Sequence, residues 1–407
     1  MFVDKLETTG QFWSPDDATK RINGALTWEP GSRARLILES RVIDELANPV
    51  TFTKTGFSIA HSGDPARIVV DGVPRLLLGE TEIGPVTCLD SYLQHLPTNL
   101  FDRTTPPFQQ VWDPIFLIVG AHLVEGHATE LDGVRAVVDG PGWWSHLPDG
   151  GVATSDAGEV ECERLDDETW LEFRPSSALS IHAADRSVRS VLTLAKLALD
   201  ADLTPGRMKI RIAGQSAWLD VQTGSENPGK ISWPDPHNLL PPESLTLERI
   251  ARWLEIERTM DGLAAAVANP VKGEAMQVHG LVACSLIEGI HKRIANPGKR
   301  DYIDRVRDLH ATAQRVAPEI TDPVDKWDAL VRNARNDLAH HNTGRSFEAQ
   351  YLNWMIAESS VNWVLRLCLL AHAGFPDEDV RSALADHQRY DFYRENLKMH
   401  VEELGTK

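Results

Sequence analysis

The pattern of hydrophobic and polar residues changes near residue 240. Before that point, short apolar runs recur between turn signals such as Asp71-Gly72 and Asp132-Gly133, and some runs alternate, as in Lys209–Ile212. Alternation keeps one face of a strand in water, and Asp-Gly turns join antiparallel strands. We expect strands at residues 34–38, 66–70, 115–119, 134–138, 170–173, 208–212 and 217–221, whereas residues 187–200 fit a strand or a helix. This pattern predicts a β-rich antiparallel sandwich or barrel-like domain.

A proline-dense stretch before residue 243 separates this region from one with helical spacing. Apolar residues such as Ile250 and Leu254 follow Ser244, which is suited to cap the first helix. We expect helices at residues 245–267, 276–295, 301–316, 323–340, 347–373 and 377–402. The predicted fold class is α+β multidomain, with a β-rich, sandwich-like domain over residues 1–238 and an all-α helical bundle over residues 243–407.

Composition and charge limit the classes of function. The chain has 407 residues, 42% of them apolar and 25% charged, which is typical of a globular protein long enough for more than one domain. Its net charge of −18 argues against a protein that coats nucleic acid through a basic surface. Residues 241–407 carry about −4 of this charge and residues 1–240 about −14, so the C-terminal region repels RNA less.

Cysteine usage and hydrophobic runs indicate neither disulfides nor a membrane span. Cys88, Cys162, Cys284 and Cys368 stand far apart without a C-x-x-C pair, so we expect reduced core thiols, no metal and no other cofactor. The most apolar run, residues 361–375, is interrupted by charge and too short to cross a bilayer, and no secretory signal is visible. We expect a cytoplasmic protein without membrane contact.

The stretch that carries the most chemistry contains the pattern R-N-x-x-x-H, as Arg335, Asn336 and His340. A guanidinium can neutralise a phosphate through a planar fork of donors, and a histidine can transfer a proton near neutral pH. Three features support this pattern. The asparagine directly follows the arginine, a helix-ending signal comes after His341, and the segment belongs to the fourth predicted helix.

Spacing alone does not make this pattern specific. The looser pattern R-x(4–6)-H also occurs at Arg305–His310 and at Arg394–His400. On a straight helix, Arg335 and His340 would point roughly 140° apart. They can act on one phosphate only if the helix end unwinds or if a second chain supplies one of them, as in a symmetric dimer. Otherwise they are an ordinary surface arginine and a solvated histidine.

Residues from about 245 to 400 resemble a HEPN domain, the helical-bundle family whose active members carry R-x(4–6)-H, often as R-N-x-x-x-H. The two-part layout is similar to that of ApeA-type abortive-infection proteins, in which a β-rich N-terminal domain precedes a C-terminal HEPN domain. The stretch Gly24–Gly31, followed by Ala34–Glu39, resembles the opening of that N-terminal domain. Leu369-Leu370 and Gly374 resemble the closing helices.

This resemblance implies a metal-independent endoribonuclease. The ribose 2′-OH would attack the adjacent phosphorus, leaving a 2′,3′-cyclic phosphate and a 5′-OH. Arg335 would stabilise charge on the non-bridging oxygens, His340 would act as general base or acid, and Asn336 would orient a phosphate or the histidine. His341 satisfies the looser spacing, and Arg332 shares a helix face with Asn336, so both are alternative or auxiliary residues.

The resemblance also implies a biological setting and partners. The protein would be a toxic effector of antiphage abortive infection that cleaves host RNA, with tRNA among the candidates. It would act as a homodimer or a higher homo-oligomer. A phage-derived trigger would be sensed by the N-terminal domain.

Three further features each allow two interpretations. A basic cluster that either grips RNA phosphates or forms a solvated helix end consists of Lys292, Arg293, Lys299 and Arg300. Glu288 lies in an apolar helix and is either a core partner of an arginine or a surface residue. Trp143 and Trp144 form either an exposed stacking platform or part of a core.

Two other classes of function compete with the nuclease. A non-catalytic HEPN module that binds a nucleotide or a protein would need Arg335 and His340 as surface residues that face apart. A ligand-binding β-sandwich for a carbohydrate or peptide, with the helices as a dimerisation domain, would need Trp143 and Trp144 exposed in a concave face.

Overall fold

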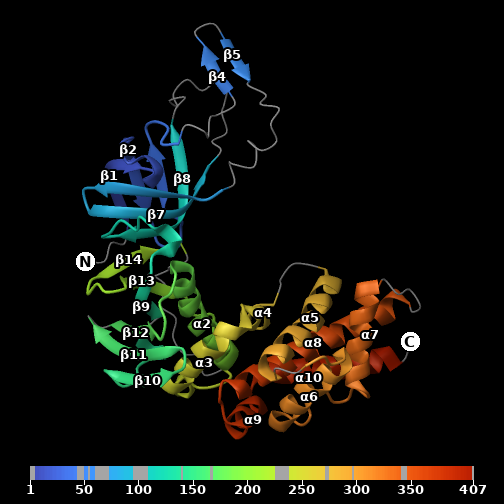
Figure 1. The fold of residues 1–407 in the computed structure, drawn as a ribbon. Helices are drawn as coiled ribbons and strands as arrows, with labels where there is room; N and C mark the ends of the chain where they lie inside the picture. The colour runs from blue at the N-terminus through green and yellow to red at the C-terminus, as the bar shows by residue number, and fades with distance from the viewer. Residues whose placement is uncertain are drawn as a thin grey trace. The chain divides into compact units, whose positions relative to one another are not determined.

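The computed structural model describes residues 5–43, 50–53, 56–59, 73–94, 109–138, 141–165, 168–224, 238–270, 275–295, 298–340 and 346–405 (Figure 1). Strands dominate the N-terminal part, over residues 6–175, and helices make up the C-terminal part, over residues 247–405. The predicted fold class is therefore confirmed.

Contacts between residues divide the chain into two compact units, each discontinuous in sequence. The first unit comprises residues 1–139, 170–188 and 204–231, and the second comprises residues 140–169, 189–203 and 232–407. The predicted domain boundary between residues 238 and 243 stays a prediction. The second unit also takes in the two earlier segments, residues 140–169 and 189–203.

The first unit contains a closed ring of antiparallel strands. In ring order the strands are β8 (Gln110–Val119), β3 (Arg35–Leu38), β2 (Ile22–Trp28), β1 (Leu6–Trp13), β6 (Arg75–Thr81) and β7 (Gly84–Leu93). Pairing of β7 with β8 closes the ring, so this part is barrel-like rather than an open sandwich. One core cluster includes Phe12, Leu26, Trp28, Leu36, Trp112 and Leu117.

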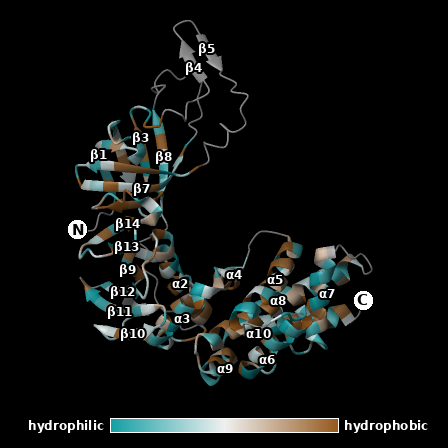
Figure 2. Cartoon of the chain, in the orientation of Figure 1, coloured by the Kyte–Doolittle hydropathy of each residue, from teal (hydrophilic) through white to brown (hydrophobic). Residues whose placement is uncertain are grey.

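From β8 to β12, the sheet continues through four more strands. They are β14 (Trp218–Gln222), β13 (Pro205–Ile212), β9 (Leu131–Val138) and β12 (Glu168–Pro175). Buried and wetter positions alternate along β13, as the alternating sequence predicts, and Figure 2 shows the mixed hydropathy of these strands. A separate hairpin pairs β4 (Val50–Thr53) with β5 (Gly56–Ile59).

Most of the predicted strands are confirmed, with small shifts at their ends. The predicted strand at residues 66–70 lies outside the described residues. The ambiguous segment 187–200 is helical, as part of α2 (Ile181–Leu199), because apolar positions recur at helical spacing along it.

The second unit combines a β-hairpin with a helical bundle. The hairpin strands are β10 (Gly151–Ser155) and β11 (Gly158–Leu165). The helices are α3 (Leu247–Met260), α4 (Leu263–Ala268), α5 (Met276–Ala295), α6 (Tyr302–Val316), α7 (Trp327–His340), α8 (Phe347–His372), α9 (Asp377–Ala385) and α10 (Gln388–Gly405). α3 packs on the hairpin, and its Trp253 indole donates a 2.9 Å hydrogen bond to the carbonyl oxygen of Ser190.

The helix boundaries differ from the prediction at four places. The predicted helix 245–267 is broken because Asp261 and Gly262 are both left-handed, with φ of 49° and 80°. Thr246, not Ser244, caps α3, and its hydroxyl accepts from the Arg249 amide. The predicted helix 377–402 separates into α9 and α10, and α7 begins at Trp327 rather than at residue 323.

Helix α8 occupies the centre of the bundle. It packs against α4, α5, α6, α7 and α10. Its apolar residues are therefore buried around most of its circumference. The Trp327 indole at the start of α7 donates a 2.7 Å hydrogen bond to the buried Ser360 hydroxyl, which fixes α7 against α8. Every helix in the described part of the chain is too short or too polar to cross a bilayer.

We expect Ser360→Ala to destabilise the bundle by about 1–3 kcal/mol, because the buried Trp327 N–H loses its partner. Ser359→Ala is the matched control, since the Ser359 hydroxyl bonds, among the described residues, to backbone carbonyls of its own helix. Urea unfolding of both variants measures the difference. Equal stabilities of the two variants would contradict the assigned role of this hydrogen bond.

Candidate functional site

Arg335 lies where α5, α6 and α7 meet. Its guanidinium carbon is 4.6 Å from the centre of the Tyr302 ring, and its Nη2 atom is 3.9 Å from a carboxylate oxygen of Glu288. The contact between Arg335 and Glu288 is an ion pair, but its distance is too long for a hydrogen bond. None of the hydrogen bonds between described residues uses the Arg335 donors, and its side chain is 34% exposed. The guanidinium is therefore held in place yet open to an anion.

Tyr302 supplies a fixed surface under this arginine. Its hydroxyl donates a 2.9 Å hydrogen bond to the Cys284 carbonyl oxygen on α5. Burial raises the pKa of the Tyr302 phenol well above its usual range, so the hydroxyl stays protonated as a donor. The ring thus stays in a position where it can stack on the guanidinium.

Glu288 pairs with cations on two helices. Its carboxylate lies 3.0 Å from the Lys292 ammonium, one turn along α5, and reaches Arg335 on its other side. The hydrogen bond from Lys292 lowers the pKa of the Glu288 carboxyl, and the charges of Lys292, Arg305 and Arg335 act in the same direction against burial. Each interpretation of Glu288 is therefore correct in part: the carboxylate has an arginine partner, and the side chain is half-exposed.

The rest of the R-N-x-x-x-H pattern follows Arg335 along α7. Asn336 is half-buried, whereas Arg332 is exposed and bonds to the neighbouring Asn333 side chain at 3.2 Å. His340 is the last residue of α7. The side chain of His340 and the whole of His341 lie outside the described residues. Because α7 is helical through His340, the backbone positions of Arg335 and His340 are roughly 140° apart around its axis.

The basic cluster is largely paired with protein groups. Arg293 donates to the carbonyl oxygens of Thr259 and Gly289 and to the carboxylate of Asp261, which ties the end of α3 to α5. Lys292 binds Glu288, as described above. Arg300 bonds to Asp308, and Lys299 is exposed. The role of these four residues in RNA binding stays a prediction.

A buried polar group beside this cluster was not predicted. His291 is 1% exposed, and its Nε2 atom lies 2.9 Å from a carboxylate oxygen of Asp308. Nη1 of Arg305, also buried, lies 3.4 Å from the other ring nitrogen of His291. Arg305 and His310, which also match the looser R-x(4–6)-H pattern, therefore have structural contacts. Arg305 belongs to this buried network, and the His310 ring hydrogen-bonds to the Thr321 hydroxyl.

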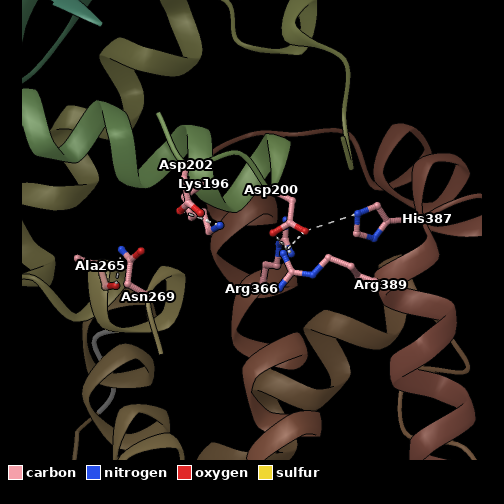
Figure 3. Close-up of polar contacts among 8 residues, drawn as sticks. All are labelled: Lys196, Asp200, Asp202, Ala265, Asn269, Arg366, His387 and Arg389. Atoms are coloured by element: carbon pink, nitrogen blue, oxygen red, sulfur yellow. Dashed lines mark hydrogen bonds and ion pairs between the residues drawn. The ribbon is translucent and has the colours of Figure 1, made fainter. Parts of the chain in front are cut away.

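A cavity of about 1120 Å³ opens elsewhere in the second unit, lined by the end of α2 and by residues of α4, α8 and α10. At its edge the carboxylate of Asp200, 8% exposed, binds the guanidinium groups of Arg366 and Arg389 and approaches His387 at 3.8 Å (Figure 3). Burial lowers the pKa of Arg366 to about 10, so the group stays charged at neutral pH. This charge cluster joins α2 to α8 and α10.

Two predictions about other side chains are resolved. Trp143 and Trp144 are 2% and 1% exposed, so the predicted stacking platform is wrong and the core interpretation is correct. Trp143 ends the short 3-10 helix Pro141–Trp143, and Trp144 follows it directly. The four cysteines are free and buried, as predicted. Burial raises the pKa of the Cys284 thiol to about 12, which makes it unreactive at neutral pH.

The chain combines a β-rich N-terminal region with a C-terminal helical bundle. Residues 7–163 match the protein-family model described as ApeA N-terminal domain 1. The match covers less than half of the chain and concerns its N-terminal part alone. No curated protein and no solved structure matches the chain. The match ends before α2, so it does not reach Arg335.

We expect Asp200→Asn to destabilise the second unit by about 3 kcal/mol, because the buried Arg366 would lose its counter-charge. Asp202→Asn is the matched control: Asp202 is 76% exposed and pairs with Lys196, so its loss should cost less than about 1 kcal/mol. Denaturant unfolding, followed by tryptophan fluorescence, compares the two. Equal effects would show that Asp200 contributes no more to the free energy of unfolding than the exposed Asp202 does.

Proposed function

We propose that the chain is an ApeA-type antiphage defence protein whose helical unit is a HEPN endoribonuclease. The family match of residues 7–163 supports the first part of this proposal. The setting of Arg335 supports the second. Its guanidinium is stacked on Tyr302 and paired at long range with Glu288, and the donors remain open to a phosphate. A preorganised donor group of this kind is what stabilises charge that develops in a transition state.

The proposed reaction needs no metal ion. A base takes the proton of the ribose 2′-OH, and the 2′-oxygen forms a bond to the adjacent phosphorus. The bond from phosphorus to the 5′-oxygen breaks, and that oxygen receives a proton. His340 moves these protons, Arg335 binds the non-bridging oxygens, and Asn336 orients the phosphate or the histidine. DNA lacks the nucleophile and should be inert.

The geometry of α7 favours a dimeric site. Arg335 and His340 lie on different sides of a helix that stays regular to its last residue. A symmetric homodimer can place two copies of the motif around one cleft, so that groups from both chains act on one phosphate. Residues 241–407 carry a net charge near −4, so this helical part of the chain repels RNA less than residues 1–240 do. We further propose host RNA, with tRNA among the candidates, as the substrate, and a phage-derived trigger.

We expect purified protein to cleave total RNA or tRNA in excess EDTA, leaving 2′,3′-cyclic phosphate ends. Arg335→Ala and His340→Ala should each slow cleavage by at least about 10²-fold. Arg394→Ala is the matched control, because Arg394 has a histidine six residues later, yet pairs with Glu319 on the surface. Wild-type and Arg394→Ala rates should agree. Absence of cleavage both with and without lysate of phage-infected cells would refute the nuclease proposal.

The Tyr302 ring should act as a positioning group for Arg335. We expect Tyr302→Leu to lower the cleavage rate roughly 3- to 30-fold, the equivalent of one cation–π contact, by releasing the guanidinium. Tyr302→Phe keeps the ring and should retain most of the rate. If both variants are equally impaired with unchanged folding, then the hydroxyl bond to Cys284, and not the stacking, matters.

A further inference from the structure

Three side chains from distant parts of the sequence converge in the first unit. Asp90 lies on β7, His127 on the short 3-10 turn Gly126–Ala128, and His182 in the first turn of α2. Nε2 of His127 is 2.7 Å from one carboxylate oxygen of Asp90, and Nε2 of His182 is 2.9 Å from the other. All three ligand atoms lie within 4.8 Å of one another. Among the described residues, these three form the group of His, Cys, Asp or Glu side chains that is close enough to hold a metal ion.

The backbone around Asp90 is built in an unusual way. Asp90 has a φ of 53°, which few residues other than glycine adopt, in the middle of a strand. The register between β6 and β7 shifts here, from Leu77 opposite Cys88 to Arg75 opposite Ser91, so β7 carries one extra residue. Bulges of this kind redirect a side chain and often accompany functional sites. The bulge aims a carboxylate toward the two histidines.

The loop that carries His127 is equally constrained. Gly126 has a φ of 55°, and a Cβ atom there would lie 3.3 Å from a Leu76 methyl carbon. A glycine therefore lets the loop approach β6 closely enough to place His127 at Asp90. His182 rests with its ring edge-on to Phe116, 5.1 Å between centres. Each ligand is thus held by its own element.

The chemistry of the cluster suits a metal ion. The His127 and His182 rings stack at 4.8 Å with 19° between their planes, and each ring presents its Nε2 atom to the same carboxylate. The Asp90 carboxylate is only 8% exposed, whereas both histidines are about half exposed. A divalent cation could bind the carboxylate and both neutral rings at once, and the open side leaves room for water as a further ligand.

The distances also fit. Ligands about 2.1 Å from a zinc ion lie roughly 3.4 Å from one another in a tetrahedron. The separations of 2.7 and 2.9 Å from Asp90 to the two histidines would have to open by about 0.5–0.7 Å. The two histidine nitrogens lie within 4.8 Å of each other, so small movements of the rings would bring all three ligand atoms to these separations. Two imidazole nitrogens and one carboxylate oxygen are typical ligands of Zn²⁺ and of other first-row divalent ions.

We propose that Asp90, His127 and His182 form a binding site for one divalent transition-metal ion of the zinc type. The site ties the β7 bulge, the loop before β9 and the start of α2 together, so that metal binding stabilises the first unit. This assignment is independent of the proposed nuclease, because its ligands lie outside the residues that carry the cleavage chemistry and its readout is binding.

The test uses the full-length protein, stripped with a chelator, dialysed and titrated with Zn²⁺. We expect about one Zn²⁺ per chain by calorimetry and elemental analysis, together with a rise in Tm. Asp90→Asn, His127→Ala and His182→Ala should each weaken binding by at least about tenfold and abolish the rise in Tm. His122→Ala is the matched control, since His122 bonds to the Gly79 carbonyl in the same unit and should leave binding unchanged.

A Co²⁺ titration separates this site from the thiols. Binding through histidine and carboxylate gives visible Co²⁺ absorption without thiolate charge-transfer bands, whereas binding to a cysteine such as Cys88 would add them. Folded wild-type protein that takes up no Zn²⁺ would overturn the proposal and leave a metal-free His–Asp–His hydrogen-bond network. Equal Zn²⁺ binding by wild type and by folded His182→Ala would also overturn it.

Discussion

The helical unit depends on the burial of α8, a 26-residue helix surrounded on most sides. Removing its apolar side chains from water is the main gain of the bundle. Such burial forces each polar group on the helix to find a partner. Ser360 receives the Trp327 indole, and Arg366 meets Asp200. Each of these contacts fixes another element, so the polar exceptions on α8 determine where α7 and the end of α2 lie.

The position of Arg335 follows from this arrangement. With α7 fixed against α8 and α5, Arg335 comes to lie over Tyr302 of α6 and beside Glu288 of α5. The Arg335 guanidinium thereby stays available to an anion, because its ion-pair partner Glu288 is already shared with Lys292. The neighbouring basic residues serve other purposes. Arg293 and Arg300 are bound by Asp261 and Asp308, so a basic run in a sequence is a poor guide to free positive surface.

The organisation into units has a practical consequence. The β10–β11 hairpin and the second half of α2 belong to the same compact unit as the helices. Ser190 accepts from Trp253, and Asp200 neutralises Arg366 within that unit. A fragment that begins near residue 240 would lose both partners and leave a buried charge and a buried N–H group unsatisfied. We therefore expect a fragment cut near residue 240 to be less stable than the same helices in the full chain.

Local pattern alone determined the elements and the fold class. Alternation in β13 and helical spacing from Ile250 onward predict the observed strands and helices, because side-chain periodicity directly reflects which face is buried. Arg335 was proposed as a site residue from spacing and family resemblance, and that role stays a prediction. Breaks in regular helices were missed where they depend on left-handed residues such as Asp261, a conformation that non-glycine residues rarely adopt.

Only the tertiary structure decided which distant residues meet. Trp143 and Trp144 have the composition of a stacking platform, yet they are buried, since burial depends on what packs over a turn and not on the turn itself. Asp90, His127 and His182 share no local motif, and strand pairing, a bulge and a helix start bring them together. Sequence spacing reports neighbours on one element, whereas a site made from three elements exists only once the chain has folded.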